Sequence, residues 1–110
     1  MNLDNEHDAL FEQLLTINQT TFEGQWYETA YHALAAAFHR AQDLGAVSLM
    51  AQVQQLATQQ MNTIDTSAPE HTLSSQSAHT RGHQSIYGLL AQQAATRIRI
   101  SNAEQGTSGC

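Results

Sequence analysis

Histidine carries most of the chemistry that this sequence could perform, since six of its 110 residues are histidines. His71, His79 and His83 accompany Arg81 in one polar stretch. Arginine binds phosphate and carboxylate groups through paired hydrogen bonds, and the free N–H groups at the start of a following helix attract the same anions. The stretch therefore indicates an anionic ligand, with these four residues as candidate binding residues.

Zinc binding is a second hypothesis for His79 and His83, which are four residues apart. Two imidazoles at that spacing on one helix can bind one zinc ion, although Gly82 between them disfavours a helix. The alternative is a polar loop whose histidines cap helices or face solvent.

A further metal hypothesis concerns His32 and His39, which share one predicted helix face with Glu28 and Asp43. The two histidines are about 10.5 Å apart along that helix, too far to share one ion without a partner helix. Because this face points away from the apolar stripe, we expect it to be solvated. We expect no cofactor, and a metal ion stays an alternative.

Catalysis is not indicated by any motif. The chain has no Gly-x-Ser-x-Gly, Cys-x-x-Cys or His-Glu-x-x-His pattern. The spacing of its residues also indicates no pair of a nucleophilic and a basic side chain. The protein is thus more consistent with a non-enzyme. Its net charge of -6 and its four arginines argue against binding to nucleic acid, which needs many cations.

Cysteine use and hydropathy indicate the cytoplasm. Cys110 is the only cysteine, so no intrachain disulfide can form. The first residues carry acids and no lysine or arginine, which predicts no secretory signal. No apolar run reaches the 18 residues that a membrane span requires, so we expect no membrane partner.

The first helix of the chain is expected over residues 5–19, with Asp4 or Asn5 as its N-cap. Its apolar stripe follows the spacing i, i+4, i+7 of an amphipathic helix and consists of Leu10, Leu14 and Ile17. Thr20 and Glu23 have the spacing of a capping box, which predicts that the next helix begins at about residue 22.

An antiparallel helical hairpin is predicted from residues 22–44 and 47–64, with Gly45 as the left-handed helix stop between them. The first of these helices has an unusually wide apolar face that contains Trp26, Tyr27, Tyr31 and Phe38. Core packing is the expected role of these aromatic side chains. The alternative is a groove for a peptide or apolar ligand, which requires Trp26 or a tyrosine to be exposed.

A long polar loop is predicted at residues 65–83, before a last helix over residues 84–100. Ser67 and Glu70 could cap one helical turn within it. We expect the loop to be ordered, with at least one of its histidines in a specific contact. Residues 1–101 would form a single helical domain, and residues 102–110 a disordered tail.

The predicted fold class is therefore all-α, a small bundle of four main helices. Such a bundle leaves the wide apolar face incompletely covered, which favours a protein-protein interaction or self-association module, with a homodimer as its expected form. Residues 1–28 contain acids and no arginine, whereas residues 71–102 contain arginines and no acid, so the two ends attract within or between chains. A ligand-binding or enzymatic domain built on residues 65–83 is the alternative.

Overall fold

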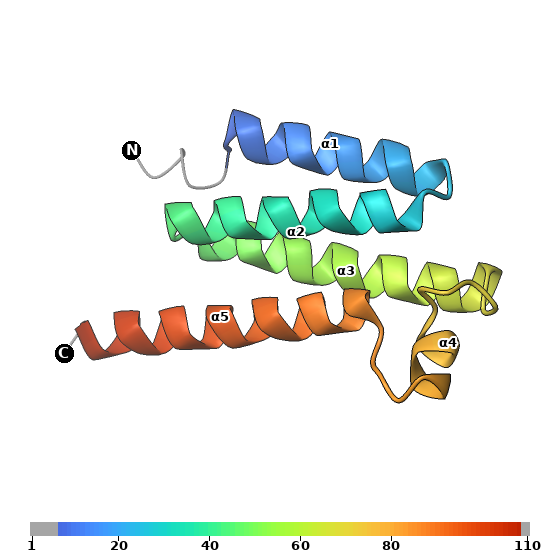
Figure 1. Ribbon diagram of the computed structural model, residues 1–110. Helices are drawn as coiled ribbons and strands as arrows, with labels where there is room; N and C mark the ends of the chain where they lie inside the picture. Colours follow the sequence, from blue (N-terminus) through green and yellow to red (C-terminus); the bar gives the residue numbers. More distant parts are fainter. Residues whose placement is uncertain (1–6, 109–110) are drawn as a thin grey trace.

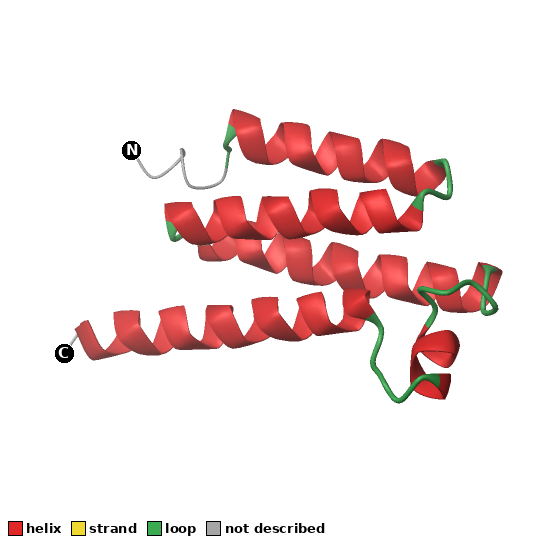
Figure 2. Cartoon of the chain, in the orientation of Figure 1, coloured by secondary structure: helices red, strands yellow, loops and turns green. Residues whose placement is uncertain are grey.

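The structure, a computed structural model, describes residues 7–108, which form helices and loops and contain no strand (Figures 1 and 2). The helices of this part of the chain are α1 (Ala9–Glu23), α2 (Tyr27–Leu44), α3 (Val47–Ser67), α4 (Ser75–Thr80) and α5 (Ile86–Ser108). The predicted all-α fold with four main helices is confirmed, and the short α4 is an addition to it.

The long helices stack in the order α1, α2, α3, α5. Helix α1 packs mainly on α2, α2 packs on α3, and α5 packs mainly on α3. As a result, α1 and α5 lie at opposite edges over most of their length (Figure 1), and they approach where the rings of Phe22 and Tyr87 meet at 6.2 Å. The molecule is elongated and thin, with dimensions of 49 × 28 × 17 Å.

The hairpin of α2 and α3 forms as the sequence predicts. Gly45 ends α2 with a φ of 63°, a left-handed conformation that glycine adopts without a Cβ clash. The Ala46 N–H donates to the Ala41 carbonyl at 3.0 Å, the bond that closes this type of helix terminus. The chain then reverses within two residues, so α3 must lie antiparallel to α2.

The core lies mainly between α2, α3 and α5, with Phe11 added from α1, and Phe38 within it is 3% exposed. Its other large members are Leu34, Leu49, Met50, Val53, Ile64, Tyr87 and Leu90. Gly88 allows α3 and α5 to approach closely, because a Cβ at this position would lie 3.1 Å from the Met61 sulfur. Tyr27 and Phe38, two residues of the wide apolar face predicted for α2, are therefore buried.

The limits of α1 differ from the prediction at both ends. Asp8 is its N-cap and accepts a hydrogen bond from the Phe11 N–H at 2.9 Å, whereas Asp4 and Asn5 lie outside the described residues. The capping box predicted at Thr20 and Glu23 is wrong, since both residues belong to the last turn of α1. Helix propagation is cooperative and continues through Glu23, until the chain turns at Gly24 and Gln25.

The buried side of α1 also differs from the prediction. Phe11 is buried and Phe22 is half-buried against the core, whereas Leu10 and Ile17 are each 48% exposed. The helix carries two neighbouring apolar stripes, but its neighbours cover one of them. The stripe with two phenylalanines is buried because aromatic rings remove more apolar area from water.

Trp26, predicted to pack in the core, is 67% exposed. It occupies the N-cap position of α2, where its backbone has φ -90° and ψ 74°. Because this conformation is not helical, its side chain does not follow the face that Tyr27 and Phe38 bury.

The predicted loop at residues 65–83 is partly helical. Helix α3 continues to Ser67, so Ser67 is not a helix cap, and the cap of the next helix is Ser74. The Ser74 hydroxyl accepts from the Ser77 N–H at 3.0 Å, and Asp65 accepts from the Ser75 N–H at 2.7 Å. Two side chains therefore satisfy the backbone at the start of α4.

The last helix is longer than predicted. It begins at Ile86 and runs to Ser108, through residues 102–108, for which the sequence predicted a disordered tail. Ala103 and Glu104 have high helix propensity, so no residue there stops a helix that has already formed. Cys110 lies outside the described residues.

Candidate functional site

The loop histidine with a clear structural role is His71. Its Nδ1 accepts a hydrogen bond from the Leu73 N–H at 3.0 Å, so the proton of the neutral ring is on Nε2. The ring packs edge-on against Tyr27, with the ring centroids 4.9 Å apart. The expected specific contact of a loop histidine is thus present, and it holds the turn after α3 against α2.

Arg81 closes the same segment. Its guanidinium donates to the Thr72 carbonyl at 3.1 Å and is otherwise exposed to solvent. At the start of α5 it is the Ser85 hydroxyl that accepts from the Gly88 N–H, at 3.3 Å. Arg81 thus bonds to its own loop, and the combination of Arg81 with the start of α5 stays a prediction.

His79 and His83 do not share a helical turn. His79 is in α4, whereas His83 follows Gly82, which ends that segment with a φ of 76°. Both histidines nevertheless line one open hollow of about 460 Å³, together with Ser75, Gln84 and Ser85. The described residues contain no group of three or more side chains that could hold a metal ion.

His32 and His39 project from α2 into solvent, as expected for a polar face. The Nε2 of His32 is 4.0 Å from a carboxylate oxygen of Glu28, and both side chains are largely exposed. An exposed pair of this kind contributes little to stability and lacks the further ligands that a metal site needs.

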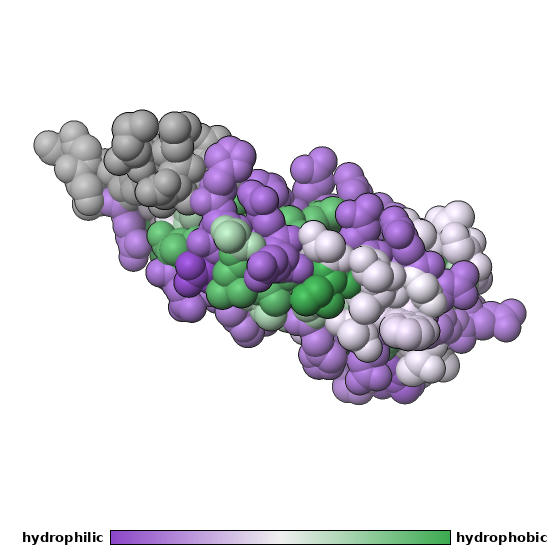
Figure 3. All heavy atoms as spheres, turned by 90° about the horizontal axis from the view of Figure 1, so that it is seen from above, coloured by the Kyte–Doolittle hydropathy of each residue, from purple (hydrophilic) through white to green (hydrophobic). Residues whose placement is uncertain are grey.

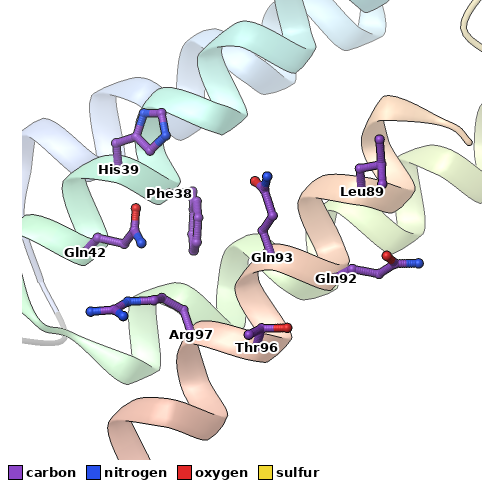
Figure 4. A pocket seen from close by; sticks show the side chains of 8 residues that line it. All are labelled: Phe38, His39, Gln42, Leu89, Gln92, Gln93, Thr96 and Arg97. Carbon is purple, nitrogen blue, oxygen red and sulfur yellow. The ribbon is translucent and has the colours of Figure 1, made fainter.

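A groove lies between α2 and α5, and it includes Phe38 from the aromatic face for which the sequence left a groove open as the alternative to core packing. Its volume is about 510 Å³, and its walls are drawn in Figure 4. The ring of Phe38 points from α2 towards α5, where Gln93 and Arg97 face it. Leu89, which is 40% exposed, continues the apolar lining on the α5 side.

A second surface is the outer side of α1, defined by Leu10, Leu14 and Ile17 and named here the α1 stripe. Figure 3 shows hydrophobic surface on the side of the molecule that carries α1. The signal was present in the sequence, because α1 has more apolar positions than one contact surface can cover. The sequence could not show which of its two stripes stays exposed.

The ion pair between Asp8 and Arg40 joins α1 to α2 through two hydrogen bonds of 2.9 Å. The bond from Arg40, with a second from the Phe11 N–H, lowers the pKa of the Asp8 carboxyl to about 2. The same pairing raises the pKa of Arg40. These perturbed groups hold the first helix in place and lie away from the groove.

The buried hydroxyl of Tyr87 donates to the Tyr27 carbonyl at 2.7 Å. Burial, with smaller contributions from Tyr27 and Tyr31, raises the pKa of Tyr87 well above its ordinary value. Because this hydroxyl is buried and bonded to a backbone carbonyl, its role is to stabilise the packing of α5 against α2.

Comparison of the chain with protein-family models, with curated proteins and with solved structures finds no match. Among the described residues, none of the helices combines the length and the hydropathy that crossing a bilayer demands. The described residues form a small all-α protein with an open helical layer, a groove between α2 and α5 that Phe38, Leu89 and polar side chains line, and an exposed apolar stripe on α1.

Proposed function

We propose that this protein is a helical interaction module that self-associates, with a homodimer as its functional form. The observation that carries the proposal is the α1 stripe, in which Leu10 and Ile17 are each 48% exposed beside the half-buried Leu14. Their spacing is that of the apolar anchors by which one helix docks on another.

The α1 stripe is not needed to complete the fold of one chain. The other side of α1 already contributes Phe11 and Phe22 to the core, and Asp8 ties its start to α2. Leu10 and Ile17 are exposed apolar residues on a surface helix, and apolar surface costs about 25 cal/mol for each Å² that water hydrates. A protein contact on this side removes that cost.

The composition supports a protein partner in the cytoplasm. Charged residues make up 13% of the chain and the net charge is -6, which suits neither nucleic acid nor an anionic membrane. A single cysteine is consistent with a reducing compartment, where disulfides do not contribute to stability.

The test is the mass in solution, measured by light scattering over a range of concentrations. We expect a dimer for the wild type and a monomer for Leu10→Gln/Ile17→Gln. Ile100→Gln is the matched control, since Ile100 is 40% exposed on α5 and lies outside the α1 stripe. A wild type that is monomeric at high concentration contradicts the proposal.

A second candidate function is the binding of a small anion in the hollow that His79 and His83 share. Their imidazoles and the hydroxyls of Ser75 and Ser85 are suitable donors for phosphate. Thermal-shift measurements with phosphate and with Zn²⁺ test it, with His79→Ala/His83→Ala as the variant that abolishes any stabilisation. Equal shifts in both proteins exclude this site.

A further inference from the structure

We propose that the groove between α2 and α5 binds a small hydroxylated organic anion, a sugar carboxylate or a sugar phosphate, with the charged group of the ligand at Arg97. The groove volume of about 510 Å³ is within the range of about 300–1,000 Å³ that is usual for small-molecule sites. The groove does not include the α1 stripe, so this inference is independent of the proposed self-association.

Arg97 is available to a ligand in this groove. Arg40 and Arg81 are held by hydrogen bonds to other groups of the chain. Arg97 is exposed and makes no hydrogen bond or ion pair within the described part of the chain. A guanidinium in this state can bind a carboxylate or a phosphate through two parallel hydrogen bonds.

The charge around Arg97 favours an anion, although the whole chain is acidic. Residues 86–103 of α5 include Arg97 and Arg99 and contain no acid. None of the residues that line the groove is acidic. Asp43 of α2 is not among them, and its charge acts on Arg40. Because the net charge of -6 repels a polyanion, a small anion is the ligand that fits this local field.

The other polar groups of the groove match hydroxyl groups. In Figure 4 the amides of Gln42, from α2, and Gln93, from α5, lie to either side of the Phe38 ring, and Arg97 reaches the same space from α5. Neither amide has a hydrogen-bond partner among residues 7–108. Each amide carries both donors and an acceptor, as a ligand hydroxyl requires, whereas an acyl chain would leave both unpaired.

The apolar part of the lining is small. Phe38 is 3% exposed, so its ring contributes little surface, and Leu89 is 40% exposed on the α5 wall. This surface matches the C–H face of one sugar ring and is too small for a long apolar tail. A cation, two unpaired amides and a small apolar surface are together the groups that a hydroxylated anion can satisfy.

Two-dimensional NMR of the isotope-labelled protein tests the inference, with glucuronate, glucose-6-phosphate, glucose and acetate as probes at one ionic strength. We expect a sugar anion to shift the backbone amides of residues 38–42 and 89–97. Glucose lacks the charge and acetate lacks the hydroxyl groups, so each should bind at least about tenfold more weakly. The tighter of the two sugar anions identifies the charged group as a carboxylate or a phosphate.

Matched variants separate recognition from nonspecific attraction. Arg97→Gln should weaken binding of the tighter sugar anion at least about tenfold, whereas Arg99→Gln makes the same change outside the groove lining and should not alter it. Gln93→Leu removes one neutral hydrogen-bonding group and should weaken binding about fivefold, with Gln55→Leu on α3 as its control. All four positions are exposed, so the variants should keep the fold.

Three results would overturn the inference. The first is an absence of shifts with both sugar anions, and the second is an Arg97→Gln protein that binds them as well as the wild type or a wild type that binds acetate equally well. The third is a set of shifts confined to residues 79–85, which would assign the anion to the hollow of His79 and His83. None of these results affects the proposed self-association, which is measured by mass.

Discussion

The buried amide pair of Asn18 and Gln60 is the most informative place to perturb this fold. Asn18 donates to the Ala30 carbonyl at 2.7 Å and to the Gln60 side-chain oxygen at 3.1 Å. Gln60 donates back to the Asn18 side-chain oxygen at 2.6 Å. The two side chains are 1% and 7% exposed, so α1, α2 and α3 meet at a polar contact that is almost entirely buried.

Asn18→Leu keeps the branched shape of the side chain but removes all three hydrogen bonds. It also leaves the Gln60 amide buried without a partner, which alone costs about 1–3 kcal/mol. We expect a destabilisation of about 3 kcal/mol. Gln60→Met should cost less, about 1–2 kcal/mol, because Asn18 retains its bond to Ala30.

The double variant Asn18→Leu/Gln60→Met replaces the whole pair with apolar groups of similar shape. Its destabilisation should be about 1 kcal/mol or less, since no polar group is left unsatisfied. The coupling energy between the two positions is then about 3 kcal/mol or more.

Urea unfolding followed by circular dichroism measures these free energies. All proteins must be compared at one concentration, because the proposed self-association would add to the apparent stability. For a domain of this size, a change of 3 kcal/mol also lowers the melting temperature by roughly 12 °C or more. Additive single effects, or an Asn18→Leu protein as stable as the wild type, would refute the argument that this pair is satisfied and buried.

Two further predictions concern the packing of α2. Phe38→Ala should destabilise the fold by about 3–5 kcal/mol in the same assay, because Phe38 is 3% exposed and packs in the core. A change below about 1 kcal/mol would contradict this burial. Asp8→Asn keeps a capping oxygen but loses the charge that pairs with Arg40, so it should lower the melting temperature at pH 7. The pKa of Asp8 is lowered from 3.8 to about 2 in the fold, so its stabilisation is present above about pH 4 and is lost as the pH falls through 2. The difference between Asp8→Asn and the wild type should therefore disappear over that interval, and a difference that persists at lower pH would contradict the role of the ion pair.

Local sequence signals determined the helices and the hairpin of this protein. The 3.6-residue periodicity of α2 and α3 and the glycine between them are properties of neighbouring residues, so they could be interpreted without a structure. The polar nature of the His32 and His39 face followed from the same periodicity. Where two local signals competed, as at Thr20 and Glu23, helix propagation through α1 outweighed the capping pattern.

The candidate loop site could be predicted only in part. The sequence placed His71, His79, Arg81 and His83 in one segment, and the structure describes that segment as folded. Within this segment, His71 accepts a hydrogen bond from the Leu73 N–H and Arg81 donates one to the Thr72 carbonyl. Both side chains therefore stabilise turns of the segment itself. Hydrogen bonds between a side chain and a nearby backbone group depend on the path of the chain, which composition does not specify.

Tertiary packing alone decided which surfaces are available for function. The spacing of α1 allowed either of its apolar stripes to be the buried one, and packing on α2 selected the stripe with Phe11 and Phe22. That selection left Leu10 and Ile17 exposed. The groove between α2 and α5 arises because both helices pack on α3 with little direct contact between them. Burial is a property of how helices meet, so a periodic pattern identifies an apolar face without saying whether its own chain covers it.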